Sequence, residues 1–508
     1  MSVKTIKFAC KFYFMKKIFL LFFLSITVLA INAQRKREFR GAWIQAVNGQ
    51  FQGMGREAMQ QMLSYQLDEL AADGVNAIIF QVRPECDALY ASKIEPWSRY
   101  LTGYQGRVPE PYWDPLQWMV EQCHKRGMEL HAWINPFRAK TKGTVALAAN
   151  HIATLHPERV FRYDNQLILD PSLPENTTYI CQVVSDIVSR YDIDGLHIDD
   201  YFYPYPASGE TIPDEAHFQQ CPNGFKTIGD WRRDHVNRFI KKMGETIHEC
   251  KPWVKFGVSP FGIFRNKTSD SIGSATRGLQ NYDDLYADVL LWINNGWIDY
   301  CVPQLYWQIG HPTADYETLI RWWDAHANHR PLFIGEDVER TVRYPDIQHP
   351  QTHQMAAKYA LHQQLLHING TVLWYAKTTV DNIGNYGSLL RNHYWHYPAL
   401  PPAMPFLDSK APHSPRSVKP TWTSDGYLLF WKAPKAKHWG DIVNRYVIYR
   451  FRKGEPIDLE DPTKLVKITS NTMYKLPYQD GTHQYTYVVT SLDRVGNESK
   501  GRKKKIKL

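Results

Sequence analysis

Two adjacent carboxylates, Asp199 and Asp200, follow a short apolar segment in the sequence DGLHIDDYFYP. A carboxylate there could act as nucleophile or general base at the anomeric carbon of a sugar, where positive charge develops in the transition state. Neighbours on a strand point to opposite sides, so the two are not expected to face the same centre, and His197 shares the parity of Asp199. Asp199 is the preferred catalytic residue and Asp200 a further candidate. A structural role for Asp199, as a helix cap or an ion-pair partner of Arg83 or Arg138, is the alternative.

Glycoside hydrolysis normally needs a second carboxyl group, about 5 Å from the first for retention or roughly 6.5–9.5 Å for inversion. The segment FGVSP, which is the fifth expected strand, ends without an acid. Glu110 is the preferred proton donor, because an acid on a long loop could reach over the glycosidic oxygen. The other candidates are Glu85, Asp87, Glu336 and Asp337.

Polar and aromatic side chains at the ends of other expected strands could bind a glycan. In each of these strands the polar residues share one parity and therefore one face, although such groups can also merely satisfy one another. We expect substrate binding by Arg83, Asp87, Asn135, Arg138, His197, Tyr201, Gln304, Tyr306 and Trp307. Trp133 and Tyr203 are further candidates for stacking on sugar rings. His131, His197 and Asp199 lack a metal-binding spacing, so no metal or other cofactor is expected.

Alternating β-rich and helical segments must position these residues, and such alternation is typical of parallel βα units. Eight strands are predicted, at residues 39–46, 76–83, 129–136, 195–199, 255–260, 300–307, 331–337 and 370–376. Helices are predicted at residues 56–72, 115–126, 176–191, 231–250, 316–328 and 352–367. Eight units predict an α/β fold, a (β/α)₈ TIM barrel over residues 34–400, with the chemistry at the carboxyl ends of the strands.

The N-terminus indicates export. From Met15 two lysines precede an apolar run and a small residue at Ala33, which is typical of a secretory signal peptide at residues 1–33 with Met15 as the start. The run is short for a membrane span, so no transmembrane segment is expected after cleavage and we place the protein in the periplasm or at the surface of a bacterium. The six cysteines beyond the signal peptide are dispersed, which leaves room for one disulfide but excludes a disulfide framework.

Charge gives no sign of a nucleic-acid partner. The formal net charge of +9 includes lysines of the N-terminal segment, and much of the remainder lies in the C-terminal run GRKKKIKL. Such a run is more often a solvated end than a nucleic-acid patch.

The sequence pattern changes after Ala399, from alternating strands and helices to a proline-rich segment and short strands. A length of 508 residues also favours two domains. A proline-rich linker is expected at residues 401–412. Short alternating strands over residues 413–508, with Trp431 and Tyr449 as core aromatics, resemble a fibronectin type III sandwich of the immunoglobulin-like class. No catalytic cluster occurs in it, so a spacer or a contact to a glycan or a protein is expected.

Long segments of the barrel closely resemble the glycosyl-hydrolase-like family 10 barrels: FRGAW, QVRPECDALYASKIEPWSRYLTG, DPLQWMVEQCHKRGMELHAWINPFRA, DGLHIDDYFYP, FGVSPFGIFRN and DYCVPQLYW. This family includes divisome-localised glycosidases of peptide-stripped peptidoglycan strands, so the resemblance implies a glycoside hydrolase of envelope or polymeric glycans. DGLHID is also similar to the fourth-strand motif of α-amylase-like barrels, in which the last Asp is the nucleophile. This similarity favours Asp199 over Asp200, and the loop of Glu110 falls inside the stretch that resembles the family.

Two other functions fit the same sequence. A barrel that binds glycans without cleaving them would explain the missing fifth-strand acid and the 14% aromatic content. A metal-dependent deacetylase is the second. We expect an exported glycoside hydrolase, with peptidoglycan strands stripped of peptides as a candidate substrate.

Overall fold

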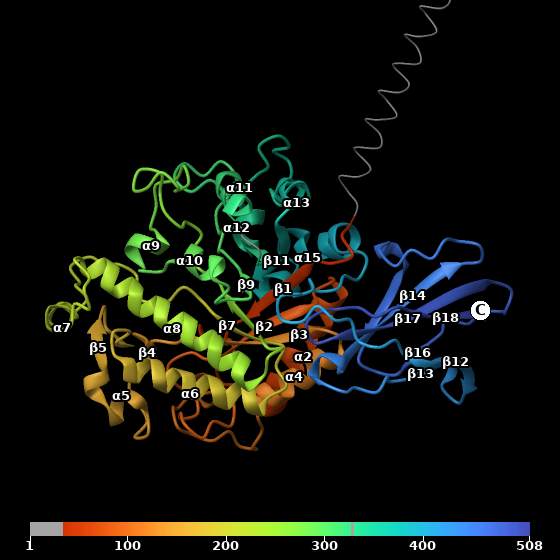
Figure 1. Cartoon of the computed structure of the whole chain (residues 1–508), viewed down its shortest axis with the longest axis horizontal. Coiled ribbons are helices and arrows are strands. Elements are labelled where there is room, and N and C mark those ends of the chain that lie inside the picture. The colour runs from red at the N-terminus through yellow and green to blue at the C-terminus, as the bar shows by residue number, and fades with distance from the viewer. Residues whose placement is uncertain (1–33, 327–329) are drawn as a thin grey trace, which may run out of the picture.

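The computed structural model describes residues 34–326 and 330–508, and a closed barrel of parallel strands lies at its centre (Figure 1). The strand order around the barrel is β1-β11-β10-β9-β8-β7-β3-β2. Its strands are β1 (Phe39–Ile44), β2 (Ala77–Arg83), β3 (Glu129–Ile134), β7 (Gly195–Ile198), β8 (Lys255–Val258), β9 (Tyr300–Cys301), β10 (Leu332–Asp337) and β11 (Ile368–Trp374). The predicted eight-stranded barrel is confirmed, whereas the predicted signal peptide lies outside the described residues.

Helices follow the strands and cover the barrel. The six predicted helices occur as α2 (Arg56–Ala72), α4 (Pro115–Lys125), α6 (Pro174–Arg190), α8 (Ile228–Cys250), α11 (Tyr316–His326) and α13 (Met355–Gln364). Asp114 caps α4 by accepting a hydrogen bond from the backbone N–H of Gln117 at 3.1 Å, and Pro115 starts the helix, where a missing N–H costs nothing. Shorter helices are α3 (Arg99–Thr102), α5 (Ile152–Leu155), α7 (Glu215–Gln220), α9 (Asn281–Asp284), α10 (Val289–Asn294), α12 (Val338–Arg343), α14 (Ala376–Val380) and α15 (Tyr386–Leu389).

Two features differ from the predicted elements. The expected strand at residues 300–307 is regular only at β9, because Pro303 has no N–H to donate to a ladder. The chain nevertheless continues along the barrel, since Gln304 forms isolated bridges with Phe261 and Gly335. The loop after β3 also contains an unpredicted antiparallel sheet of β4 (Arg138–Lys140), β6 (Gln166–Leu169) and β5 (Val160–Tyr163).

Aromatic rings and a buried polar network fill the part of the barrel interior near the amino-terminal ends of the strands. Phe39 and Phe333 stack with their ring centroids 4.2 Å apart. His131 lies 2.7 Å from the Tyr300 hydroxyl and 3.0 Å from Glu129, which also pairs with Lys255 at 2.5 Å. These buried charged groups therefore have partners inside the barrel core, which offsets the cost of burying them.

Residues 416–507 form two antiparallel sheets. One holds β12 (Arg416–Thr423), β13 (Gly426–Lys432) and β16 (Met473–Lys475), and the other holds β15 (Leu465–Thr469), β14 (Val443–Arg452), β17 (Gln484–Asp493) and β18 (Arg502–Lys507). Both sheets contribute to one core, in which Trp431 lies 5.4 Å from Tyr446 between ring centroids. Assignment of these sheets to the fibronectin type III class stays a prediction.

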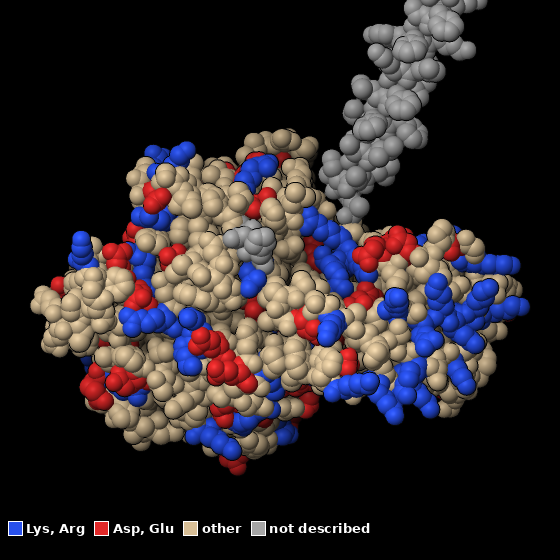
Figure 2. Space-filling view, in the orientation of Figure 1, with Lys and Arg blue, Asp and Glu red and all other residues tan. Residues whose placement is uncertain are grey.

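The basic C-terminal run is a strand in this structure. β18 pairs with β17 at the edge of the four-stranded sheet, and Arg502, Lys503, Lys505 and Lys507 are exposed. Figure 2 shows Lys and Arg gathered over this part of the molecule. Lysines on an edge strand hinder edge-to-edge pairing with another chain.

The C-terminal sheets pack against the amino-terminal ends of the barrel strands. Met404, which precedes β12, and Val495, which follows β17, belong to the same cluster of buried side chains as Phe39 in the barrel. Figure 1 shows these sheets and the β4–β6–β5 sheet on opposite sides of the barrel. Over the two described ranges of the chain, no helix is long and apolar enough to span a membrane, and the six cysteines found there are all free.

Candidate active site

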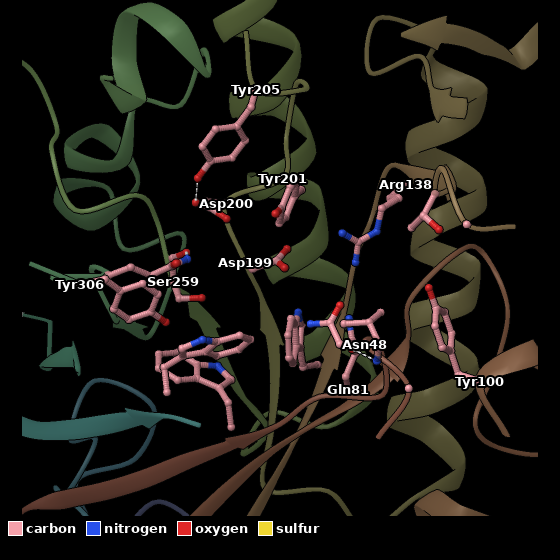
Figure 3. Close-up of a pocket in the computed structure, with 18 of the residues that line it drawn as sticks. Asn48, Gln81, Tyr100, Arg138, Asp199, Asp200, Tyr201, Tyr205, Ser259 and Tyr306 are labelled. Carbon is pink, nitrogen blue, oxygen red and sulfur yellow. Dashed lines mark hydrogen bonds between the residues drawn. The ribbon is translucent and has the colours of Figure 1, made fainter. Parts of the chain in front are cut away.

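A cavity of about 590 Å³ opens at the carboxyl ends of the barrel strands. Residues from β1, β2, β3, β11 and the loops after β1, β7, β8 and β9 surround it (Figure 3). It is lined by Trp43, Val47, Asn48, Gly49, Gln81, Arg99, Tyr100, Trp133, Arg138, Thr141, Gly143, Asp199, Asp200, Tyr201, Tyr205, Ser259, Gln304, Tyr306 and Trp374. The cavity is therefore where the barrel fold places the chemistry of most such enzymes.

A chain of amides fixes the orientation of Asp199, which follows the last residue of β7. Gln81 accepts hydrogen bonds from the backbone N–H groups of Ala46 (2.9 Å) and Val47 (3.3 Å), so its amide nitrogen donates to Asn135 at 2.7 Å. Asn135 in turn donates to Oδ2 of Asp199 at 2.6 Å. Oδ1 of Asp199 is buried and has no hydrogen-bond partner among the described residues. An unpaired buried oxygen in a side chain that lines a cavity requires a partner from outside the chain, such as a water molecule or a ligand.

Asp200 lines the same cavity as Asp199, contrary to the prediction that the two face different centres. The prediction was wrong because β7 ends at Ile198, so the strict alternation of a strand no longer applies beyond it. The Tyr205 hydroxyl donates a hydrogen bond to Oδ2 of Asp200, as Figure 3 shows. Gln304 also contacts the carboxyl group of Asp200.

Burial raises the pKa of both carboxyl groups, to different extents. For Asp199 the rise is opposed by Arg138 and by the Asn135 hydrogen bond, and the pKa is about 6. For Asp200 the negative charge of Asp199 adds to the effect of burial, and the pKa is about 7. Arg138 and Asn135 thus favour the ionised form of Asp199, whereas the charge of Asp199 favours the protonated form of Asp200, which suits the roles of base and acid.

Aromatic rings form one side of the cavity. Trp374 lies 6.1 Å from Trp43, 6.3 Å from Trp133 and 6.2 Å from Tyr306 between ring centroids. The indole N–H of Trp133 is buried without a hydrogen-bond partner in the described chain. Flat apolar surfaces beside a few polar groups are typical of sites that bind small ligands and sugars.

Several predicted binding residues reach the cavity, and others lie just outside it. Arg138, Tyr201, Gln304 and Tyr306 line it, and the guanidinium of Arg138 lies 4.9 Å from the ring centroid of Tyr201. Asn135 does not line the cavity, but its side chain donates a hydrogen bond to Asp199. Trp307 does not line the cavity and packs on Phe261 with the ring centroids 5.3 Å apart, and Tyr203 is buried against Tyr286.

Arg83 and Asp87 are structural and do not line the cavity, so their predicted binding roles are corrected. A β-bulge between Gln81 and Arg83 in the ladder with β3 turns Arg83 away from the cavity. Its guanidinium pairs with Glu95 at 2.6 Å, and both side chains are fully buried. Asp87 is buried beneath the loop after β2, where it accepts hydrogen bonds from Gln105 and the backbone N–H of Glu85. Neither residue is the partner of Asp199.

The structure also separates His197 and Glu110 from the cavity. His197 is buried under it between the Tyr300 hydroxyl (3.1 Å) and the Ser259 hydroxyl (2.9 Å). Glu110 is exposed and lines a different hollow, with Arg56 and Arg107. The predicted pairing of Glu110 with Asp199 therefore does not occur in this structure, because the long loop places Glu110 in a hollow lined by the start of α2 and by residues of α3.

The remaining acidic candidates have structural partners. Glu85 accepts a hydrogen bond from the Thr144 hydroxyl at 2.6 Å, and Glu336 pairs with Lys358 at 2.5 Å. Asp337 caps α12. Within residues 34–326 and 330–508, no group of three His, Cys, Asp or Glu side chains is placed to hold a metal ion.

Several lining residues escaped prediction. Trp43 and Trp374 lie near the ends of the first and last strands, where strand parity could have identified them. Ser259 lies within the quoted segment FGVSPFGIFRN, and Tyr205 directly follows the quoted segment DGLHIDDYFYP. Asn48 and Thr141 come from loops, and Arg99 and Tyr100 come from the single-turn helix α3, and none of these segments carries a periodic signal in the sequence.

The chain is similar to several known proteins. The family model described as Glycosyl hydrolase-like 10 matches residues 38–351. Glycosyl hydrolase YngK of Bacillus subtilis (strain 168) is 38% identical over 500 residues, which cover 96% of this chain and 96% of YngK. Glycosyl hydrolase DigH of Escherichia coli (strain K12) is 36% identical over 315 residues, which cover 58% of this chain and 71% of DigH. Among solved structures, the PgaB (BpsB) glycoside hydrolase domain from Bordetella bronchiseptica matches 70% of this chain and 99% of its own, with a TM-score of 0.45 and 10% identity.

Proposed function

The chain belongs to the glycosyl hydrolase-like 10 family, and from this premise we propose that it is an exported glycoside hydrolase of polymeric or cell-envelope glycans. The observation that carries the proposal is the pair Asp199 and Asp200 in one aromatic-walled cavity at the carboxyl end of the barrel. Export is supported by the sequence around Met15 and Ala33.

The two carboxyl groups have distinct roles in this proposal. Asp200, with a pKa of about 7, gives its proton to the glycosidic oxygen as the bond to the leaving sugar breaks. Asp199, with a pKa of about 6, is ionised and stabilises the positive charge that develops around the anomeric carbon. Asp200 thus takes the role for which the sequence favoured Glu110.

Peptidoglycan strands stripped of their peptides are the substrate that we favour. Arg99 and Arg138 line the cavity, and arginine binds carboxylates through paired hydrogen bonds. Muramic acid without its peptide carries a free lactyl carboxylate, which an arginine at the cavity can bind.

The test is product analysis by mass spectrometry after incubation with amidase-treated, peptide-free glycan strands. We expect shorter oligosaccharides from the wild type and from Glu110→Gln, and a loss of at least about 100-fold in rate from Asp199→Asn and from Asp200→Asn. Full activity of either Asp variant would contradict the assigned site. Glycan binding without cleavage, equal in wild type and variants, would instead identify a glycan-binding barrel, and release of acetate that chelators abolish would identify a deacetylase.

A further inference from the structure

The acidic groups of the cavity all come from one strand end. Of the described residues that line it, only Asp199 and Asp200 are acidic, and they are consecutive. Figure 3 shows Asp200 turned toward Tyr205 and Asp199 lying nearer to Arg138. The residues that line the other sides of the cavity, such as Asn48, Tyr100 and the tryptophans, are not acidic.

This arrangement leaves one position of the usual mechanism unfilled. A retaining enzyme with a protein nucleophile places its acid and its nucleophile on two sides of the scissile bond, with the carboxyl groups about 5–5.5 Å apart. Two consecutive residues approach the sugar from the same wall. The group that attacks the opposite face of the anomeric carbon must then be a water molecule or a part of the substrate.

The unsatisfied polar atoms of the site indicate which of these it is. Asp199 offers a buried acceptor, Oδ1, and Trp133 offers a buried donor, its indole N–H; neither has a partner within the described residues. Leaving such groups unpaired costs about 1–3 kcal/mol each, so their presence at a cavity suggests a ligand that satisfies them. A secondary amide has one N–H and one C=O, and is the complement of this pair.

The aromatic rings that line the cavity suit the apolar part of such an amide. Trp43, Trp133, Trp374 and Tyr306 contact one another through ring edges and faces with centroid separations of 6.1–6.5 Å. All four line the same cavity as Asp199 and give it an apolar surface that would accept a methyl group. An N–H acceptor, a C=O donor and an apolar surface are the three features that an acetamido group requires.

Resting on the proposed function, we propose that the cavity binds a sugar with a 2-acetamido group, and that this group, rather than a carboxylate of the protein, attacks the anomeric carbon. The acetamido oxygen forms a bond to C1 while the bond from C1 to the glycosidic oxygen breaks. The leaving oxygen keeps the electron pair and takes the proton of Asp200. Asp199 accepts the N–H hydrogen bond and stabilises the positive charge of the cyclic oxazolinium ion.

The second half of the reaction restores both partners. Water attacks C1 and gives a proton to the Asp200 carboxylate, while the bond from C1 to the acetamido oxygen breaks and its electron pair reforms the C=O. The configuration at C1 is inverted twice and therefore retained. Trp133 holds the carbonyl oxygen through its N–H, and Asn135 positions Asp199.

Three measurements test this inference. Cleavage of peptide-free strands followed by nuclear magnetic resonance should show retention at C1. The same strands after chemical removal of the N-acetyl groups should be cleaved at least about 100-fold more slowly. The thiazoline analogue of N-acetylglucosamine, a stable mimic of the cyclic intermediate, should inhibit the enzyme and bind to it in calorimetry.

Variants keep the outcomes distinct. Asp199→Asn and Trp133→Phe should each weaken thiazoline binding at least 10-fold, whereas the matched control Glu110→Gln should leave it unchanged. Inversion at C1, equal cleavage of de-acetylated strands, or a covalent glycosyl adduct on Asp199 would overturn the inference and leave the proposed hydrolase standing. No cleavage of any strand together with no thiazoline binding would overturn both.

Discussion

Burial controls the protonation of the two carboxyl groups that line the cavity. Burial raises the pKa of Asp199 to about 6, and burial plus the charge of Asp199 raises that of Asp200 to about 7. In the proposed mechanism Asp199 is ionised and Asp200 is protonated. We therefore expect kcat/KM for peptide-free strands to fall below about pH 6, as Asp199 takes up a proton, and above about pH 7, as Asp200 loses one. Initial rates across pH 4–9 check this, and a rate that keeps rising to pH 9 would contradict it.

A variant of Arg138 tests which of the two carboxyl groups gives the acidic limb of the pH profile. Its charge lowers the pKa of Asp199, and its guanidinium donates to Asn135 at 2.6 Å. Without that charge the ionised form of Asp199 is less stable, so Arg138→Ala should move the acidic limb of the profile to higher pH and leave the alkaline limb in place. A shift of the alkaline limb alone would mean that the two carboxyl groups have been assigned in the wrong order.

The same burial makes Asp200 costly for folding. Its pKa in the folded protein exceeds the value of about 3.9 expected in the unfolded chain. Its contribution to stability is complete below about pH 4 and is lost as the pH rises through about 7, where the folded state must carry a buried charge. Asp200→Asn should therefore unfold in urea with a free energy about 1–3 kcal/mol higher than wild type at pH 8, and with little difference near pH 4. The exposed control Glu110→Gln should match wild type at both values, and a destabilised Asp200→Asn at pH 8 would refute the account.

The order of the elements was predictable, whereas local departures from regularity were not. The alternation of apolar strands and helices predicts the barrel, and strand parity places Gln304, Tyr306 and Asn135 near Asp199. Arg83 has the same parity as Gln81, but the bulge between them rotates it into an ion pair with Glu95. A bulge inserts one residue without changing composition, so no periodic signal reveals it.

The loops explain the other failures. A strand fixes the direction of a side chain to one of two faces, but a loop such as that of Glu110 can follow many paths of similar local preference. Contacts distant in the sequence decide among these paths. The acid in the loop was therefore predictable as a candidate but not as a neighbour of Asp199.

One buried carboxylate connects the loops that form the cavity wall. Glu85 accepts hydrogen bonds from the Thr141 backbone N–H (2.9 Å), the Thr144 hydroxyl (2.6 Å) and Arg99 (3.2 Å), and so joins the loop after β2 to the loop after β4. Arg99 and Thr141 line the cavity. Glu85→Ala should raise KM for glycan strands about 10-fold or more, with a smaller change in kcat, because the wall loosens while Asp199 and Asp200 stay in place.

Steady-state kinetics of Glu85→Ala and of Glu121→Ala, an exposed residue of α4, separate this effect from a general one. Glu121→Ala should behave as wild type. If Glu85→Ala lowered kcat and left KM unchanged, the loops would have to act on the reacting groups and not on substrate binding.

At the scale of the whole molecule, the two C-terminal sheets close the end of the barrel away from the cavity. Arg445 of β14 is buried at this contact, where it donates to the Met128 carbonyl at 2.7 Å and lies 3.7 Å from both Glu129 and Asp194. Glu129 belongs to the polar network inside the barrel, and Asp194 accepts a hydrogen bond from the backbone N–H of Leu130 at 2.9 Å. The C-terminal sheets thus supply a positive charge close to two buried carboxylates of the barrel.

Loss of Arg445 would remove one positive neighbour of Glu129 and Asp194, which keep the closer partners Lys255 (2.5 Å) and His124 (2.7 Å). Most single substitutions cost about 0.5–3 kcal/mol, so we expect Arg445→Ala to lower the free energy of unfolding by about 1–3 kcal/mol. Arg452→Ala, at an exposed position of the same strand, should change it by less than about 0.5 kcal/mol. Because the cavity lies at the opposite ends of the strands, kcat/KM of folded Arg445→Ala should equal that of the wild type. Unchanged stability in urea would show that the sheets are attached to the barrel without supporting it, and lost activity at full stability would show that the contact acts on the site.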